Sequence, residues 1–367
     1  MATEVPDDLT SAVGIRHFRY FLYFRFALTF SSQMMGVIVG WQVYAITGSP
    51  LTLGLIGLAE VVPYVGTSLF GGHVADLIDR RNISLLCAAL FTSCGVMLLC
   101  ITEVADPAWP HVEYLFYGVI FLTGIIRGFM VPAVFALFAQ IVPRRLYLNA
   151  SAWNTNLWHL AAVAGPAAGG MVYGFWGIIP AYVGVVLVAS SSLIAMWRIP
   201  AFQIELSGEK EPMVQAIAKG VRFVFSNQII FGALALDLVA VLFGGAVAML
   251  PVFASDVLHT GPEGLGYLRA APFLGSVLMG VYLAYRSPMR RAGWAMLWCV
   301  GAFGACMVLF AVSTNFLLSF TLLLLSGVFD SVSVVVRATV LQLMTPDNMR
   351  GRVSAVNNIF VGTSNEL

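Results

Sequence analysis

Long apolar runs separated by short polar turns dominate this chain. Ten runs reach or approach the roughly 20 residues that a helix needs to cross a bilayer, and an eleventh begins near Arg352 and is cut off at Leu367. The longest polar interval, 198–227, leaves six runs before it and at least five after it. The pattern predicts an all-α multi-pass membrane protein with a six-helix bundle at 1–197, a linker loop at 198–227 and a second bundle at 228–367. The ten runs lie at about 18–44, 51–75, 83–102, 114–141, 149–173, 178–197, 228–253, 264–285, 292–312 and 315–344.

The stretch 122–157 occurs twice, because a shift of 203 positions places it on 325–360. Pro143 then falls on Pro346. In both copies an apolar run ends at the proline, a short charged turn follows, and a new apolar run begins. An internal repeat in a hydrophobic chain indicates a transporter built from two related halves, with its site between them.

Composition makes lipid the expected solvent of this chain. Apolar residues make up 59% of the 367 residues and charged residues only 10%, whereas soluble domains are about one quarter charged. The net charge of +1 gives no general attraction to nucleic acid. Residues 1–11 carry Glu4, Asp7 and Asp8 and no basic residue, so we expect the first run to stay as a membrane anchor. The five cysteines form no CxxC pair and suit apolar packing, and neither a metal nor a cofactor is expected.

Basic residues collect in every second loop. Fifteen of the nineteen Lys and Arg residues lie in the N-terminal arm or in the loops around Arg80, Arg144, 198–222, 286–291 and Arg350. The alternate loops contain no Lys or Arg, and their acidic residues include Glu103, Asp106, Asp256 and Glu263. By the positive-inside rule, the N-terminus and the central linker are predicted to be cytoplasmic.

The other four arginines, Arg25, Arg127, Arg269 and Arg337, lie within predicted helices. A charge at bilayer depth costs roughly 2.5–3.5 kcal/mol on insertion scales, so each should face a wet cavity or a partner. Glu60 is an acid at helix depth and matches Arg269 in the repeat if a gap of three residues is allowed. Arg337 either lines the cavity or snorkels to the interface.

Opposite charges occupy two pairs of repeat-related positions. Arg127 matches Asp330, and Arg25 matches Asp237 when the turns that follow these runs are aligned. Burial disfavours a charged carboxylate and a neighbouring arginine favours it, so an aspartate whose arginine can leave is a candidate proton carrier. We hypothesise that Asp237 or Asp330 takes up a proton as substrate leaves, with Glu60 as a rival carrier. The alternative is that these pairs only hold the halves in register.

Two motifs support a family resemblance. The second run ends in GGHVADLIDRR, which contains Gly72, Asp76, Arg80 and Arg81. This pattern resembles the loop motif of the major facilitator superfamily, although Leu77 and Asp79 replace its usual basic residue and glycine. The fifth run contains Gly165, Pro166, Gly169 and Gly170. These resemble the GPxxGG core of the antiporter motif in proton-coupled exporters of that superfamily, with Ala152 and Ala161 where glycines are usual.

The resemblance extends over essentially the whole chain, and the phrases at 40–54 and 350–358 are similar to the bacterial branch that includes the enterobactin exporter. It implies two pseudo-symmetric six-helix bundles in the bacterial inner membrane, so we expect this sequence to be truncated in its eleventh helix and its second bundle to be incomplete. It also implies that spans 1, 4, 7 and 10 line a central cavity.

The resemblance further assigns each motif a role. Asp76 is expected to pair with a guanidinium and with the N-terminus of the eleventh helix near 351–355, which forms a cytoplasmic latch. The alternative is that Arg80 and Arg81 are only topology charges. Small residues in the fifth run should let another helix approach closely and seal one side, or they serve general packing.

The favoured function is a proton-coupled exporter of a small organic molecule, such as a siderophore, by alternating access. A broad multidrug exporter is the alternative in the same class. A membrane-embedded enzyme is disfavoured because no HExxH, GxSxG or GK[ST] motif is present, and a channel because opposing charges do not form a ring of one sign. The expected partners are a small-molecule substrate, protons and the lipid bilayer, with no nucleic acid, and the expected state is a monomer.

Overall fold

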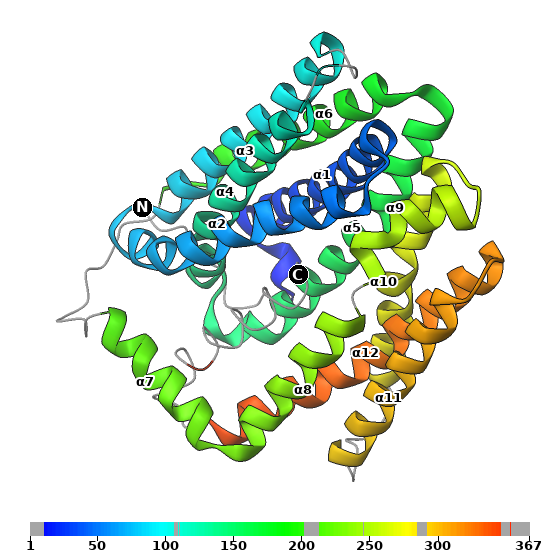
Figure 1. Cartoon of the computed structure of the whole chain (residues 1–367). Coiled ribbons are helices and arrows are strands. Elements are labelled where there is room, and N and C mark those ends of the chain that lie inside the picture. The colour runs from blue at the N-terminus through cyan, green and yellow to red at the C-terminus, as the bar shows by residue number, and fades with distance from the viewer. Residues whose placement is uncertain are drawn as a thin grey trace. The chain divides into compact units, whose positions relative to one another are not determined.

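The computed structural model describes residues 11–105, 109, 111–201, 213–244, 246–284, 292–345 and 353. These residues form helices and no strand (Figure 1), so the all-α prediction is confirmed. The first six helices are α1 (Arg16–Thr47), α2 (Pro50–Leu77), α3 (Arg80–Val104), α4 (Glu113–Ile141), α5 (Tyr147–Trp176) and α6 (Ile178–Trp197). The others are α7 (Met213–Ser226), α8 (Gln228–Gly244), α9 (Leu250–Val252), α10 (Pro262–Ala284), α11 (Ala292–Ala311) and α12 (Phe316–Met344). Short helical turns lie at Ala12–Gly14, Arg144–Leu146, Ala246–Met249 and Phe253–Val257.

Local sequence signals place the helix ends close to the predicted limits of the apolar runs. Gly48 ends α1 in the left-handed region, with φ of 60°, which glycine adopts without a steric penalty. Pro50 then starts α2 at its first turn, where a missing N–H costs nothing. Asp79 caps α3 by accepting a hydrogen bond from the backbone N–H of Arg81 at 2.9 Å.

Residue contacts divide the chain into two compact units. The first comprises residues 1–206 together with 251–270, and the second comprises 207–250 and 271–367. This division follows the predicted halves except that residues 251–270 group with the first unit. The arrangement of the helices as two six-helix bundles stays a prediction.

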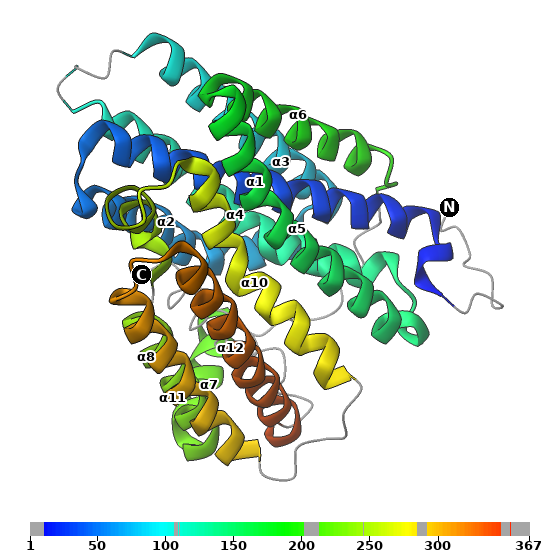
Figure 2. The same cartoon turned by 90° about the vertical axis from the view of Figure 1, so that its right-hand side faces the viewer.

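In the first unit, α2 packs along α4, α1 lies beside α5 and α6, and α3 contacts α4 and α6, as Figure 2 also shows. Its core includes the rings of Phe18, Phe21 and Phe138. A polar network crosses this core, because the Tyr182 hydroxyl donates to the Gln42 side-chain oxygen at 2.6 Å. The Gln42 amide in turn donates to Thr102 at 3.0 Å. Buried polar groups are thus paired with one another, as an apolar interior requires.

The repeat found in the sequence recurs as a repeated helix contact. A Cβ added to Gly124 on α4 would meet the backbone carbonyl of Glu60 on α2. A Cβ added to Gly327 on α12 would meet the backbone carbonyl of Pro272 on α10. Gly124 and Gly327 are related by the shift of 203 positions. The contacts therefore match Glu60 with Pro272, and the suggested equivalence of Glu60 and Arg269 is wrong because it required an unneeded gap.

Eight helices within the described residues are long and apolar enough to cross a membrane, judged by length and composition. They are α1, α2, α3, α4, α6, α10, α11 and α12. Helix α5 has the required length, but Asn154, Asn156 and His159 make its sequence less apolar. Helix α8 has 17 residues and is followed by further helical turns up to Val257. The start of the predicted eleventh run lies outside the described residues apart from Val353.

The linker contains a helix where the sequence predicted only a loop. Helix α7 occupies Met213–Ser226. At its C-terminal end Val224 is fully buried against Ile230 and Leu234 of α8, whereas Lys219 and Arg222 are exposed. Because the prediction rested on uninterrupted apolar runs, it passed over an amphipathic helix of 14 residues.

Candidate functional site

Arg127 and Glu60 form an ion pair between α4 and α2 in the first unit. The Nη1 atom of Arg127 lies 2.9 Å from Oε1 of Glu60. The Arg127 guanidinium also lies 4.9 Å from the ring centroid of Tyr64, one helical turn after Glu60. The two charged side chains are 38% and 26% exposed, so the pair is neither a surface bridge nor fully buried. The sequence analysis singled out both charged residues, but it predicted neither their ion pair nor the contact between the Arg127 guanidinium and the Tyr64 ring.

We expect the Arg127–Glu60 pair to contribute to stability. Arg127→Gln leaves the Glu60 carboxylate without this guanidinium and should lower the free energy of unfolding by about 1–2 kcal/mol, between the values for exposed and buried pairs. The double variant Glu60→Gln/Arg127→Gln should recover part of that loss. Thermal unfolding of the purified protein in detergent measures both in a double-mutant cycle. A coupling energy near zero would contradict the assigned pair.

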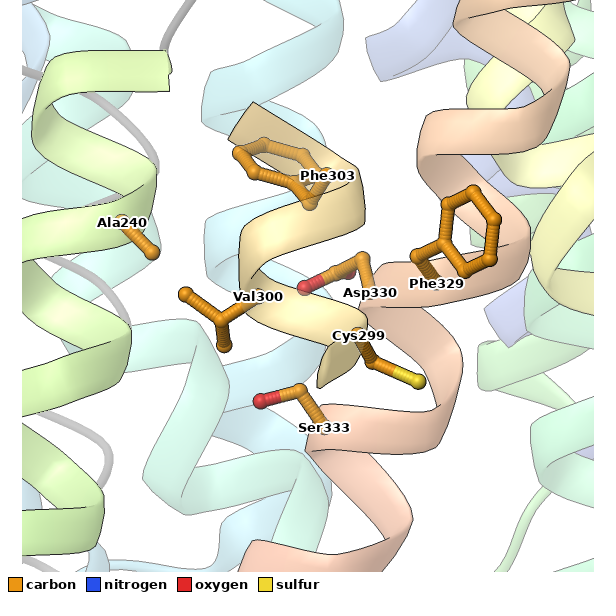
Figure 3. A pocket seen from close by; sticks show the side chains of 7 residues that line it. All are labelled: Ala240, Cys299, Val300, Phe303, Phe329, Asp330 and Ser333. Carbon is orange, nitrogen blue, oxygen red and sulfur yellow. The ribbon is translucent and has the colours of Figure 1, made fainter. Parts of the chain in front are cut away.

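Asp330 lies in a different environment in the second unit. It lines a small cavity of about 10 Å³, near the minimum for one water molecule, together with residues of α8, α11 and α12. The lining residues are Ala240, Cys299, Val300, Phe303, Phe329, Asp330 and Ser333. In Figure 3 the oxygen atoms of Asp330 and Ser333 point toward the side where Val300 and Ala240 lie. No ion pair of Asp330 is found in the part of the chain that the structure describes.

The repeat explains this difference between Arg127 and Asp330. Asp330 is the repeat equivalent of Arg127, and the equivalent of Glu60 is Pro272, which has no charge. Ser333, one turn after Asp330, has a buried hydroxyl without a hydrogen-bond partner among the described residues. The cavity thus combines one carboxylate and one hydroxyl with mostly apolar walls. Such a site can hold a proton or a water molecule more readily than a large organic molecule.

For the second predicted pair, the structure describes the side chain of Arg25 but not that of Asp237. Arg25 is half-buried on α1, and its Nε donates to the side-chain oxygen of Asn154 on α5 at 3.4 Å. Asp237 lies in α8, and its side chain is outside the described residues. The proposed relation between these residues therefore stays a prediction. Of the remaining arginines, Arg269 lies against Gly36 of α1, and Arg337 is buried at 5% exposure.

Helix α5 makes the close contacts that its small residues predict. A Cβ on Gly165 would lie 2.7 Å from the carbonyl oxygen of Phe30 on α1. A Cβ on Gly170 would lie 2.8 Å from Cα of Gly266 on α10. In the other direction, a Cβ on Gly266 would lie 2.6 Å from the carbonyl oxygen of Pro166. Gly169 packs against Met34 of α1. Helix α5 therefore touches two helices almost backbone to backbone, and whether this contact seals one side of the protein stays a prediction.

The arginines of the loop motif hold helix ends. The Nε atom of Arg80 donates to the carbonyl of Ala75 near the end of α2 at 3.2 Å. The Nη2 atom of Arg81 donates to the carbonyl of Trp197 at the end of α6 at 2.9 Å. Cations suit the C-terminal ends of helices. These contacts do not test the predicted latch, because the Asp76 side chain and residues 351–352 and 354–355 lie outside the described part of the chain. Gly72, also in the motif, is half-buried in α2.

A further contact, which the sequence did not single out, joins α1 to the helical turn Phe253–Val257. The Tyr44 hydroxyl donates a hydrogen bond to the Asp256 carboxylate. This hydrogen bond, a second one from Ser255 and the charge of His259 hold the pKa of Asp256 below its ordinary value. Asp256 therefore favours its ionised form, which makes it a stronger acceptor for Tyr44. In the sequence Asp256 served only as an acidic residue of an alternate loop.

Comparison with known proteins gives a consistent assignment of fold and class. Residues 21–365 match the family described as Major Facilitator Superfamily. The chain is 26% identical over 347 residues to a protein named enterobactin exporter EntS from Shigella boydii serotype 18, covering 92% of this chain and 80% of that protein. A protein of the same name from Escherichia coli O1:K1 is 27% identical with the same coverage.

Solved structures share the fold at low sequence identity. A bacterial homologue of the lysosomal transporter Spinster, in an inward-facing occupied state, has a TM-score of 0.68 and 14% identity, covering 96% of this chain and 80% of that one. A bacterial homologue of the iron transporter ferroportin, in an inward-facing state, has a TM-score of 0.68 and 13% identity, covering 96% and 89%. At these identities the likeness establishes the fold alone.

Proposed function

The chain belongs to the Major Facilitator Superfamily, and from that premise we propose that it is a proton-coupled exporter of a small organic molecule. The family and the named relatives are transporters and exporters, so the expectation of a transporter and not an enzyme is confirmed. Transporters of this kind work by alternating access, in which two related halves move around a site near the membrane midplane. Proton coupling and substrate identity are the parts of the proposal that go beyond the family.

The contrast between Glu60 and Asp330 is the observation that carries the proton coupling. Glu60 is engaged by Arg127 at 2.9 Å, and a bound guanidinium favours the charged carboxylate. Asp330 lies in a small, mostly apolar cavity, and no ion pair of it is found among the described residues. A carboxylic acid that can exist in both protonation states suits a carrier better than one fixed in an ion pair. We therefore favour Asp330 over Glu60 as the proton carrier.

For the substrate we propose a siderophore of the catecholate type. The relatives at 26% and 27% identity are named enterobactin exporters. Arg127 stacked near the Tyr64 ring, with 38% of its side chain exposed, offers a cation and an aromatic face side by side. A bulky aromatic molecule with acidic hydroxyl groups would find both kinds of contact there.

The proposal includes an orientation and an oligomeric state. The N-terminus and the linker face the cytoplasm of a bacterial cell, because Lys and Arg residues lie in every second loop. One chain carries its own proton carrier and its own cationic and aromatic groups, so a monomer is sufficient for transport.

Reconstitution of the full-length protein in sealed proteoliposomes tests the proposed function. We expect enterobactin to accumulate only under an imposed pH difference and to be recovered chemically unchanged. Collapse of the gradient by a proton ionophore and protein-free liposomes are the controls. Accumulation without a gradient would refute the coupling. Transport of cationic dyes in place of the catecholate would favour a multidrug exporter.

A further inference from the structure

A groove lies between the beginning of α1 and the end of α6. It has a volume of about 360 Å³ and belongs entirely to the first unit. Its lining residues are Arg19, Tyr20 and Tyr23 from α1 and Ser191, Ile194, Ala195 and Arg198 from α6. Neither the transport proposal nor the family motifs use these residues.

One end of the groove concentrates positive charge. The Cζ atoms of Arg16 and Arg198 both lie 5.8 Å from the ring centroid of Tyr20, and Arg19 lines the same groove. No carboxylate occurs among the seven lining residues. The beginning of α1 adds the positive end of a helix dipole. Guanidinium groups gathered around one ring repel each other, so an anion placed between them would be strongly favoured.

The other end of the groove is apolar and continues along α6. Leu187 and Ile194 are 64% and 59% exposed and lie on the same helix face as Arg198 at the end of α6. The Tyr23 hydroxyl donates to Ser191 at 3.0 Å, so two of the lining residues join α1 to α6. Trp197, next to Arg198, is 68% exposed, and such residues favour the membrane interface. The face therefore changes from cationic to apolar over the last turns of one membrane helix.

We propose that this groove binds one anionic phospholipid, with its phosphate between Arg19 and Arg198 and an acyl chain along Ile194 and Leu187. The arginines match the headgroup charge and the apolar face matches the chain. Inorganic phosphate shares the charge of the headgroup, but it has no hydrocarbon chain to contact the apolar face. The lipid is therefore the occupant that satisfies both ends of the groove.

Native mass spectrometry of the full-length protein in mild detergent tests this assignment. The protein is titrated with phosphatidylglycerol and, in parallel, with phosphatidylcholine of the same acyl chains. We expect one tight site that prefers phosphatidylglycerol. The variant Arg19→Gln/Arg198→Gln removes two charges and should weaken phosphatidylglycerol binding about 30-fold, with little change for phosphatidylcholine. Ile194→Ser should weaken both lipids while keeping the preference between them.

The control removes the same number of charges elsewhere. Arg144→Gln/Arg145→Gln alters two exposed arginines in the turn before α5 and should leave the preference intact. Equal loss in both double variants would mean general attraction to anionic surfaces and would overturn the proposal. Unchanged binding in Arg19→Gln/Arg198→Gln, with an unchanged melting temperature, would also overturn it. Displacement of the lipid by millimolar inorganic phosphate would reassign the groove to a free anion.

Discussion

Replacement of Asp330 by asparagine is expected to abolish accumulation driven by a pH gradient while substrate exchange continues. With the membrane potential held at zero, each exchanged proton supports about tenfold accumulation per pH unit. Asparagine occupies nearly the same volume in the cavity beside Ser333 but cannot bind and release a proton. The accumulation ratio should therefore fall to about one, the value for simple equilibration.

Exchange of labelled for unlabelled substrate across the same liposomes separates coupling from folding. Exchange requires no net proton movement, so Asp330→Asn should retain it. Ser333→Ala, which removes the neighbouring hydroxyl of the same cavity, is the matched control and should keep gradient-driven accumulation. Glu60→Gln tests the rival carrier, which the structure places in an ion pair. Loss of coupling in Glu60→Gln and its retention in Asp330→Asn would reverse the assignment.

Asp237 is the second aspartate that has to be tested as a proton carrier. It was selected from the sequence by the same repeat argument as Asp330, and its side chain is outside the described residues. If both Asp330→Asn and Asp237→Asn retain gradient-driven accumulation, neither aspartate carries the proton. The proposal that opposed charges in the two halves drive the coupling would then be untenable.

The sequence predicted the helices well because bilayer thickness dictates their lengths. An apolar run of sufficient length has few alternatives in lipid, since every backbone polar group must be satisfied within the helix. Gly48, Pro50 and Asp79 then set the ends by ordinary turn and capping chemistry. Helix α7 escaped this reasoning because its sequence mixes apolar and polar residues and contains no long apolar run; at its C-terminal end Val224 packs against α8.

The site was predicted in its residues but not in its contacts. Position along a helix can be read from the sequence, so Arg127, Glu60 and Asp330 were found at membrane depth. Which neighbouring helix a long side chain reaches depends on the rotation and packing of both helices. The α2–α4 contact through Gly124 brings Glu60 to Arg127, whereas the equivalent position near Asp330 is the uncharged Pro272, and no ion pair of Asp330 is found among the described residues. The same kind of glycine contact, at repeat-related positions, therefore lies beside an ion pair in the first repeat and beside an aspartate in a mostly apolar cavity in the second.

Replacement of Gly170 by alanine should produce the largest structural effect among these variants. The added Cβ would lie 2.8 Å from Cα and 3.0 Å from N of Gly266, and both are backbone atoms. A side chain could rotate away, but a backbone can yield only if α5 and α10 separate. We expect a loss of at least about 2 kcal/mol in the free energy of unfolding, at the upper part of the range for overpacking. Thermal unfolding in detergent measures this loss.

Gly66→Ala is the matched control, because a Cβ at Gly66 on α2 would meet no atom within 4 Å. In a helix interior this change should be neutral or stabilise the protein by up to about 1 kcal/mol. A small effect in Gly170→Ala, equal to that of Gly66→Ala, would contradict the close α5–α10 contact.

The same variant distinguishes a seal from general packing. If α5 and α10 close one side of the transporter, their separation should let protons leak through Gly170→Ala liposomes in the absence of substrate. A pH-sensitive dye inside the liposomes should then report faster loss of an imposed gradient than with the native protein. If the variant is less stable but holds the gradient as long as the native protein, the glycines serve packing alone. A faster proton leak through Gly170→Ala liposomes would therefore show that the α5–α10 contact blocks protons in addition to stabilising the fold.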